Sequence, residues 1–163
     1  MEIVYEVKVE VPFGSEGSIA RKLKLKFIEE RSGIDYYLKP KGDEILKLKR
    51  IDDGNNILYE VSFDGECFRI VCTNMSNSES DRLLAENPSA MVFERRTRIY
   101  VANDLGVNIE MEYFKQFPNR LFFEIVSDSR EGTMNAKGKI MEKTGISGFI
   151  NLTYDKLALE KEQ

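Results

Sequence analysis

The chain has 163 residues, of which 42% are hydrophobic and 32% charged, a composition typical of one folded domain. Its formal charge of −4 and the lack of a basic tail argue against binding to extended nucleic acid. Histidine is absent, which excludes His-based catalytic triads, HExxH proteases and His-rich zinc sites. Any chemistry must therefore rely on carboxylates, Lys, Arg, Tyr or a hard metal ion.

Hydropathy and cysteine use predict a cytoplasmic protein. No apolar run approaches the length of a membrane span, and the first residues, MEIVYEVKVE, lack the character of a signal peptide. Cys67 and Cys72 lie too far apart on one expected strand to form a disulfide with each other. We therefore expect free thiols, no membrane partner and a reducing compartment.

Apolar and polar residues alternate with a period of two along most of the chain, which predicts strands. The expected strands cover residues 3–11, 34–38, 44–51, 56–63, 66–72, 91–102, 106–114 and 119–127. The Asp64-Gly65 step between two of these segments is typical of a tight hairpin.

Helical patterns separate or follow these strands. The first expected helix begins at Ser15 or Ser18 and ends near Gly33, with Ile19, Leu23 and Phe27 on its apolar face. A second covers about residues 79–87 before Pro88, a third follows Ser127 and ends at Gly145, and a last one covers about 152–160. This order predicts an α+β fold of about eight antiparallel strands in a closed or strongly curved barrel, with flanking helices.

Charged residues occupy the strand positions opposite the apolar ones. The members of this set that could form a binding site are Glu6, Lys8, Lys47, Lys49, Arg69, Arg96, Arg98, Glu110, Glu112 and Glu124. On the strand 91–102, Ile99 and Val101 indicate that Arg96 and Arg98 share the charged face, and Arg95 with Thr97 is the competing register. If the charged face points inward, basic side chains could grip phosphates while carboxylates hold Mg²⁺ or Mn²⁺.

Several of these segments resemble the CYTH family, the triphosphate tunnel metalloenzymes. Val4-Tyr5-Glu6-Val7-Lys8 is similar to the family's opening ExExK motif, and Leu46-Lys47-Leu48-Lys49-Arg50 resembles its LRLR strand. Further similar segments follow in the family's order, namely Asp35-Tyr36-Tyr37, Arg96-Thr97-Arg98, Asn108 to Glu112, Phe122 to Val126 and Tyr154-Asp155-Lys156-Leu157. The sequence departs from the family pattern at Val4 and Val126, where the motifs carry acids.

This resemblance implies a single CYTH-like domain over residues 1–163 and assigns roles to the charged residues. Glu6 and Lys8 would be catalytic, and a divalent Mg²⁺ or Mn²⁺ would bind Glu6, Glu110, Glu112 and Glu124. The phosphates of a nucleotide or another small polyphosphate would bind Lys8, Lys47, Lys49, Arg69, Arg96 and Arg98. The sequence leaves the oligomeric state open, with a homodimer as one possibility.

Three functions remain open at this stage. The first is a metal-dependent phosphohydrolase or nucleotide cyclase. The CYTH family includes class IV adenylyl cyclases and thiamine triphosphatases. The second is a non-catalytic module of the same fold that binds a phosphorylated ligand, which the missing acids at Val4 and Val126 favour. The third is a structural sheet protein whose charges are solvated.

Overall fold

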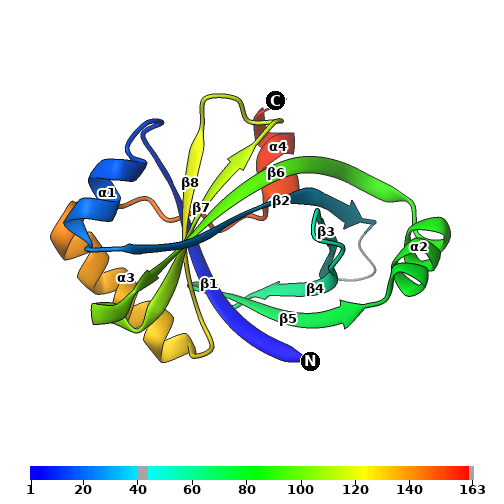
Figure 1. The fold of residues 1–163 in the computed structure, drawn as a ribbon, viewed down its shortest axis with the longest axis horizontal. Helices are drawn as coiled ribbons and strands as arrows, with labels where there is room; N and C mark the ends of the chain where they lie inside the picture. The colour runs from blue at the N-terminus through cyan, green and yellow to red at the C-terminus, as the bar shows by residue number, and fades with distance from the viewer. Residues whose placement is uncertain (40–43, 162–163) are drawn as a thin grey trace.

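The computed structural model describes residues 1–39 and 44–161, which form a closed barrel of eight antiparallel strands flanked by helices (Figure 1). The strand order around the barrel is β1-β5-β4-β3-β2-β6-β7-β8, and β8 returns to pair with β1. The predicted α+β barrel is confirmed. The elements are β1 (Glu2–Val11), α1 (Glu16–Lys22), β2 (Lys26–Leu38), β3 (Ile45–Ile51), β4 (Asn56–Phe63), β5 (Phe68–Met75), α2 (Asn77–Glu86), β6 (Ser89–Ala102), a 3-10 turn (Asn103–Leu105), β7 (Val107–Phe114), β8 (Leu121–Ser127), α3 (Arg130–Thr144) and α4 (Tyr154–Lys161).

Strand β1 closes the barrel because it pairs along both of its edges. Its first half pairs with β5, where Glu6 lies opposite Phe68, and its second half pairs with β8, where Lys8 lies opposite Glu124. Successive side chains of a strand point to opposite faces, so Glu6 and Lys8 share one face of β1. The register therefore brings the charged positions of β1 and β8 side by side.

The larger apolar core lies outside the barrel, between the sheet and helices α1 and α3. Ile19 of α1 and Ala136 and Ile140 of α3 are buried in it. The strands contribute Val7, Val9, Val11, Ile109, Met111, Leu121, Phe123 and Ile125. Because these strands turn their apolar face outward toward the helices, the charged positions between them point into the barrel.

An aromatic cluster inside the barrel borders the charged region. Its buried members are Tyr37, Phe93, Phe114, Phe117, Phe122 and Tyr154. The rings of Phe114 and Tyr154 lie 4.5 Å apart, and Leu157 and Ala158 of α4 pack against the cluster. Helix α4 thus contributes a tyrosine to the barrel interior while its next turn covers the aromatic cluster.

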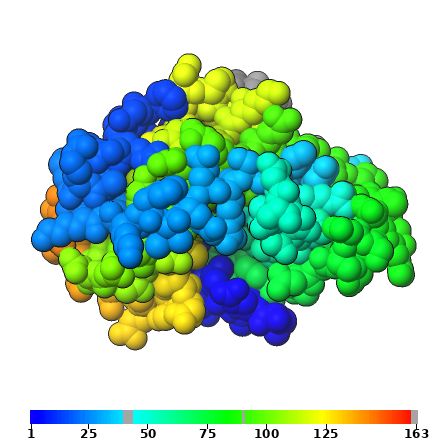
Figure 2. All heavy atoms as spheres, viewed as in Figure 1, coloured from blue at the N-terminus to red at the C-terminus, as the bar shows by residue number. Residues whose placement is uncertain are grey.

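Helix α2 projects at one end of the molecule, where β5 connects to β6 (Figures 1 and 2). Its start is fixed by a capping box, in which the Ser76 hydroxyl accepts from the Glu79 amide and the Glu79 carboxylate accepts from the Ser76 amide. Arg50 of β3 donates to the Ser80 hydroxyl at 2.8 Å, which ties the helix to the barrel. The predicted helix exists and begins slightly earlier than expected.

The helix predicted from Ser15 to Gly33 is wrong over its second half. Helix α1 ends at Lys22, Lys24 adopts a left-handed φ of 52°, and residues 26–38 form strand β2. Phe27, assigned to the helical face, pairs with Tyr100 of β6 and is 46% exposed. The long ladder between β2 and β6 outweighs the local spacing of apolar residues, which alone is compatible with a helix.

Among the described residues, no helix is both long enough and apolar enough to span a membrane. The third predicted helix ends at Gly145, as expected, with that glycine in the left-handed conformation at a φ of 73°.

Candidate functional site

A polar cavity of about 280 Å³ lies inside the barrel. Residues of all eight strands and of α4 line it, and Met1 and Glu2 lie at its edge. Its charged lining residues are Glu2, Glu6, Arg31, Asp35, Lys47, Lys49, Arg95, Glu110, Glu112 and Glu124. Charges of opposite sign thus face the same enclosed space, which suits an anion held together with a cation.

Carboxylates of three strands meet on one side of this cavity. Glu6 comes from β1, Glu110 from β7 and Glu124 from β8, and the register places Glu110 directly opposite Glu124. One carboxylate oxygen of each lies within 4.8 Å of the other two. An oxygen-only cluster of this size could hold a hard divalent cation such as Mg²⁺ or Mn²⁺.

Lys8 and Tyr154 contact this carboxylate cluster on the side where it borders the aromatic cluster. The Tyr154 hydroxyl donates to Glu124 Oε2 at 2.5 Å, and Lys8 Nζ lies 3.7 Å from Glu6 Oε2. Lys8 also sits over the rings of Tyr154 and Phe68, at 4.0 and 4.6 Å from their centroids. Lys8 is only 3% exposed and does not line the cavity, and its contacts here are with Glu6 and the two rings.

Three carboxyl groups of the acidic side, those of Glu110, Glu112 and Glu124, have raised pKa values. Burial, together with the charge of Glu124, raises the pKa of Glu112 to about 7. Burial, together with the charge of Glu6, raises the pKa of Glu124 to about 8, and burial also raises the pKa of Glu110. A divalent cation among these groups would favour their ionised forms by offsetting both their desolvation and their mutual repulsion.

The opposite side of the cavity is basic and aromatic. Lys47 and Lys49 project inward from β3, and the Tyr59 ring of β4 lies 4.9 and 5.0 Å from their respective ammonium groups. Lys49 also approaches the Tyr59 hydroxyl at 3.4 Å. Burial alone would lower the pKa of Lys47, but the nearby Tyr37 and Asp35 raise it, so the ammonium group stays charged.

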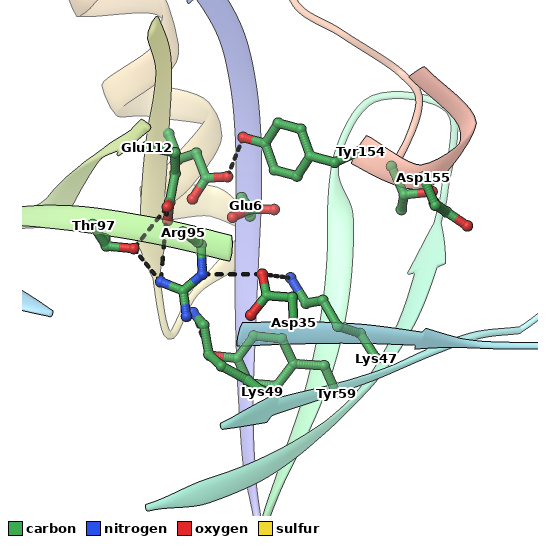
Figure 3. Close-up of polar contacts among 12 residues, drawn as sticks. Glu6, Asp35, Lys47, Lys49, Tyr59, Arg95, Thr97, Glu112, Tyr154 and Asp155 are labelled. Carbon is green, nitrogen blue, oxygen red and sulfur yellow. Dashed lines mark hydrogen bonds and ion pairs between the residues drawn. The ribbon is translucent and has the colours of Figure 1, made fainter. Parts of the chain in front are cut away.

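A buried network around Arg95 connects the two sides (Figure 3). Arg95 Nε donates to Asp35 Oδ2 at 3.0 Å, while its Nη1 donates to the Thr97 hydroxyl. That hydroxyl donates in turn to Glu112 Oε2 at 2.7 Å. Lys47 Nζ lies 3.9 Å from the same Asp35 oxygen that accepts from Arg95. Arg95 thus joins a carboxylate of the acidic side to a carboxylate beside the lysines.

The structure brings together most of the predicted site residues. Glu6, Lys8, Lys47, Lys49, Glu110, Glu112 and Glu124 all point into the barrel interior. Their assignment to metal or phosphate stays a prediction.

The inward placement of Arg96 and Arg98 is wrong, and the competing register holds. Arg96 and Arg98 lie on the outer face, where both pair with Glu30 at 2.9 and 3.1 Å, while Arg95 and Thr97 are buried inside. The prediction assumed that apolar residues of β6 mark the outer face. On this strand both faces carry apolar residues, because Tyr100 and Ala102 join the outer core.

Arg69 is likewise exposed on the outer face of β5, which corrects its assignment to the phosphate site. Its neighbours Phe68 and Ile70 are buried in an apolar cluster with Val61, and Ile70 and Cys72 line the cavity. On β5 the apolar side therefore faces the interior, opposite to the arrangement on β1.

Asp35 and Tyr154 are site residues that the charge pattern missed. Asp35 is fully buried between Arg95 and Lys47. Two signals in the sequence point to it, namely its place as an acid within the apolar segment Ile34 to Leu38 and the resemblance of Asp35-Tyr36-Tyr37 to a CYTH segment. Tyr154 lies thirty positions beyond Glu124, and no local pattern connects a helix residue to a strand carboxylate at that separation.

No protein-family model matches the chain, and a search of curated proteins also finds no match. Solved structures do match. The PH1012 protein of Pyrococcus horikoshii OT3 is 19% identical, with a TM-score of 0.77 over 96% of this chain and 99% of its own. Two proteins named "putative adenylate cyclase" also match: that of Vibrio parahaemolyticus (14% identity, TM-score 0.67, 96% and 98% covered) and that of Bacillus halodurans (10%, 0.69, 93% and 95%).

At these identities the likeness establishes the fold alone. The barrel of this chain extends over nearly the full length of each of those three structures. The chain therefore shares its barrel architecture with these structures, and membership of the CYTH family stays a prediction.

Proposed function

We propose that the chain is a metal-dependent enzyme that acts on a triphosphate-containing substrate held in the barrel, as a phosphohydrolase or as a nucleotide cyclase. The observation that carries the proposal is the enclosed cavity itself. In it the carboxylates of Glu6, Glu110 and Glu124 face the cations Lys47, Lys49 and Arg95.

The carboxylate cluster fits a divalent ion. Glu6, Glu110 and Glu124 would hold Mg²⁺ or Mn²⁺, because each presents an oxygen within 4.8 Å of the others and Glu112 lies in the same cavity. When bound, such an ion polarises a phosphoryl oxygen and lowers the pKa of a coordinated water.

The protein's own side chains account for substrate binding and orientation. Lys47, Lys49 and Arg95 neutralise phosphoryl oxygens, and the burial of Lys49 and Arg95 strengthens their contacts by excluding water. Tyr154 fixes the carboxyl of Glu124 through its hydrogen bond, and Lys8 keeps Glu6 oriented by its charge.

Two structural neighbours support a nucleotide as the substrate class, since both are named "putative adenylate cyclase". A non-catalytic ligand-binding protein is the second candidate. Val4 and Val126 favour it, because both line the cavity where further acids could complete a metal site.

The test measures phosphate and pyrophosphate release from ATP, thiamine triphosphate and tripolyphosphate, each with Mg²⁺ and with Mn²⁺. Phosphate release identifies a hydrolase, and pyrophosphate with a cyclic nucleotide identifies a cyclase. Binding without turnover supports the second candidate. Wild-type protein that neither binds nor turns over any of the three contradicts the proposal.

A matched pair of variants locates the activity. Lys49→Ala removes an inward cation, whereas Arg96→Ala removes a cation from the outer face. The binding of tripolyphosphate should weaken in Lys49→Ala by about 1.5–3 kcal/mol of binding free energy. In Arg96→Ala it should stay unchanged. Equal losses in both would place phosphate binding outside the barrel.

A further inference from the structure

Two buried atoms of the Arg95–Asp35 pair have no hydrogen-bond partner. They are Arg95 Nη2 and Asp35 Oδ1, and among the described residues only Ser15 Oγ shares this condition. Asp35 is fully buried and Arg95 is 6% exposed, and both line the cavity. Figure 3 shows the guanidinium reaching between Asp35 on one side and Thr97 with Glu112 on the other.

The remaining atoms of the pair are fully engaged. Arg95 Nε and Nη1 donate to Asp35 and Thr97, and Asp35 Oδ2 is shared by Arg95 and Lys47. A buried polar group without a partner costs free energy, and the cost is larger when the group is charged. A ligand that supplies both missing partners therefore gains free energy that a ligand supplying only one does not.

The two atoms require opposite chemistry from that ligand. Arg95 Nη2 is a donor, and a phosphoryl oxygen can accept from it. Asp35 Oδ1 is a carboxylate acceptor, and the charges of Arg95, Lys47 and Lys49 outweigh burial and hold the pKa of Asp35 below its usual value. A fully ionised inorganic polyphosphate has acceptors only, so it would leave Oδ1 unpaired and meet the charge of Asp35.

We propose that Asp35 is a specificity-determining residue that selects an organic phosphate ester over inorganic polyphosphate. A hydroxyl or amino group of the organic part donates to Asp35 Oδ1, while a phosphate oxygen of the same ligand accepts from Arg95 Nη2. Asp35 also offsets part of the positive charge of Arg95 and Lys47, which reduces the attraction for a bare polyphosphate. This inference rests on the proposed function, since it concerns the same cavity.

The experiment compares the affinity of wild-type protein and Asp35→Asn for organic triphosphates and for tripolyphosphate. The probes are ATP, GTP, CTP, thiamine triphosphate and tripolyphosphate, measured by calorimetry at about pH 8.5, with Ca²⁺ as the divalent ion to slow turnover. The wild type should bind at least one organic triphosphate about tenfold more tightly than tripolyphosphate. In Asp35→Asn the amide can present a donor in place of Oδ1, so affinity for tripolyphosphate should rise and this ratio should fall about tenfold.

Glu2→Gln is the matched control for the loss of a negative charge. Glu2 is exposed and lines the same cavity. Its replacement should strengthen the binding of all the triphosphates alike and leave the ratio of organic to inorganic affinity unchanged. An equal ratio in Asp35→Asn and wild type would overturn the proposal. If Asp35→Asn does not fold, the wild-type ratio alone decides, because tripolyphosphate binding as tightly as every organic probe also overturns it. Binding of none of the probes to the wild type would instead contradict the proposed function.

Discussion

Replacing Glu124 with Gln should make the stability of the metal-free protein less dependent on pH. Burial, with the charge of Glu6, raises the pKa of Glu124 to about 8 in the folded protein, whereas an unfolded glutamate titrates near its usual value. The unfolded chain therefore releases this proton first as the pH rises. The stabilisation is complete below about pH 4.5 and is lost progressively as the pH rises toward 8.

The size of the effect follows from the shift. One pKa unit corresponds to about 1.4 kcal/mol, so the rise at Glu124 makes a contribution on the order of several kcal/mol across this range. Glu112, with a pKa of about 7, contributes in the same direction. Glutamine keeps the shape of the side chain and cannot ionise, so Glu124→Gln should retain only the dependence due to the remaining carboxyls.

The assay is urea unfolding at pH 5 and pH 8, with EDTA and again with saturating Mn²⁺. The free energy of unfolding of the wild type should fall at pH 8 in EDTA and recover with Mn²⁺, by about 2.7 kcal/mol at one hundred times the dissociation constant. The free energy of unfolding of Glu124→Gln should fall less at pH 8 in EDTA and should recover less with Mn²⁺. The exposed Glu142→Gln on α3 serves as the control and should follow the wild type. A wild type equally stable at both pH values in EDTA would refute the reasoning.

Three further predictions concern single positions. Tyr154→Phe should lower the free energy of unfolding by about 1 kcal/mol, measured with urea, because it removes the hydrogen bond to Glu124; an unchanged value would contradict that contact. Gly33→Ala should lower the melting temperature by several degrees, since a Cβ there would lie 2.2 Å from the Arg50 carbonyl oxygen; a variant that melts with the wild type would disprove this packing. Val126→Glu adds a carboxylate to the cavity lining and should tighten Mn²⁺ binding in calorimetry; weaker binding in a folded variant would count against the metal site.

The fold was predictable where one face of a strand is apolar throughout. On β1 the alternation of valines with Glu6 and Lys8 fixes the two faces, and the outward valines pack under helices α1 and α3. Two-residue periodicity gives the parity of a strand and does not say which face turns inward. That choice depends on long-range packing against the helices, which no single segment encodes.

The same limit explains the errors on β5 and β6. Arg69 alternates with buried Phe68 and Ile70, but those two residues fill the barrel interior. On β6, the apolar residues on both faces leave parity undecided, and the pairing of Arg98 with Glu16 of α1 at 2.6 Å holds that side outward. Contacts between segments this distant in sequence decide which face of such a strand turns toward the barrel interior.

The separation of core from site bears on the missing acids at Val4 and Val126. In this barrel the larger apolar core lies outside the sheet, so the packing of that core does not depend on which charges line the interior. Buried charges such as Glu112 and Glu124 instead oppose folding, because burial and mutual repulsion raise their pKa values. Stability therefore does not account for their presence, whereas the proposed binding of a cation and a phosphorylated ligand would. By the same reasoning, a valine in place of an acid removes a charge that opposes folding, and under the proposed function it would weaken metal binding and slow turnover.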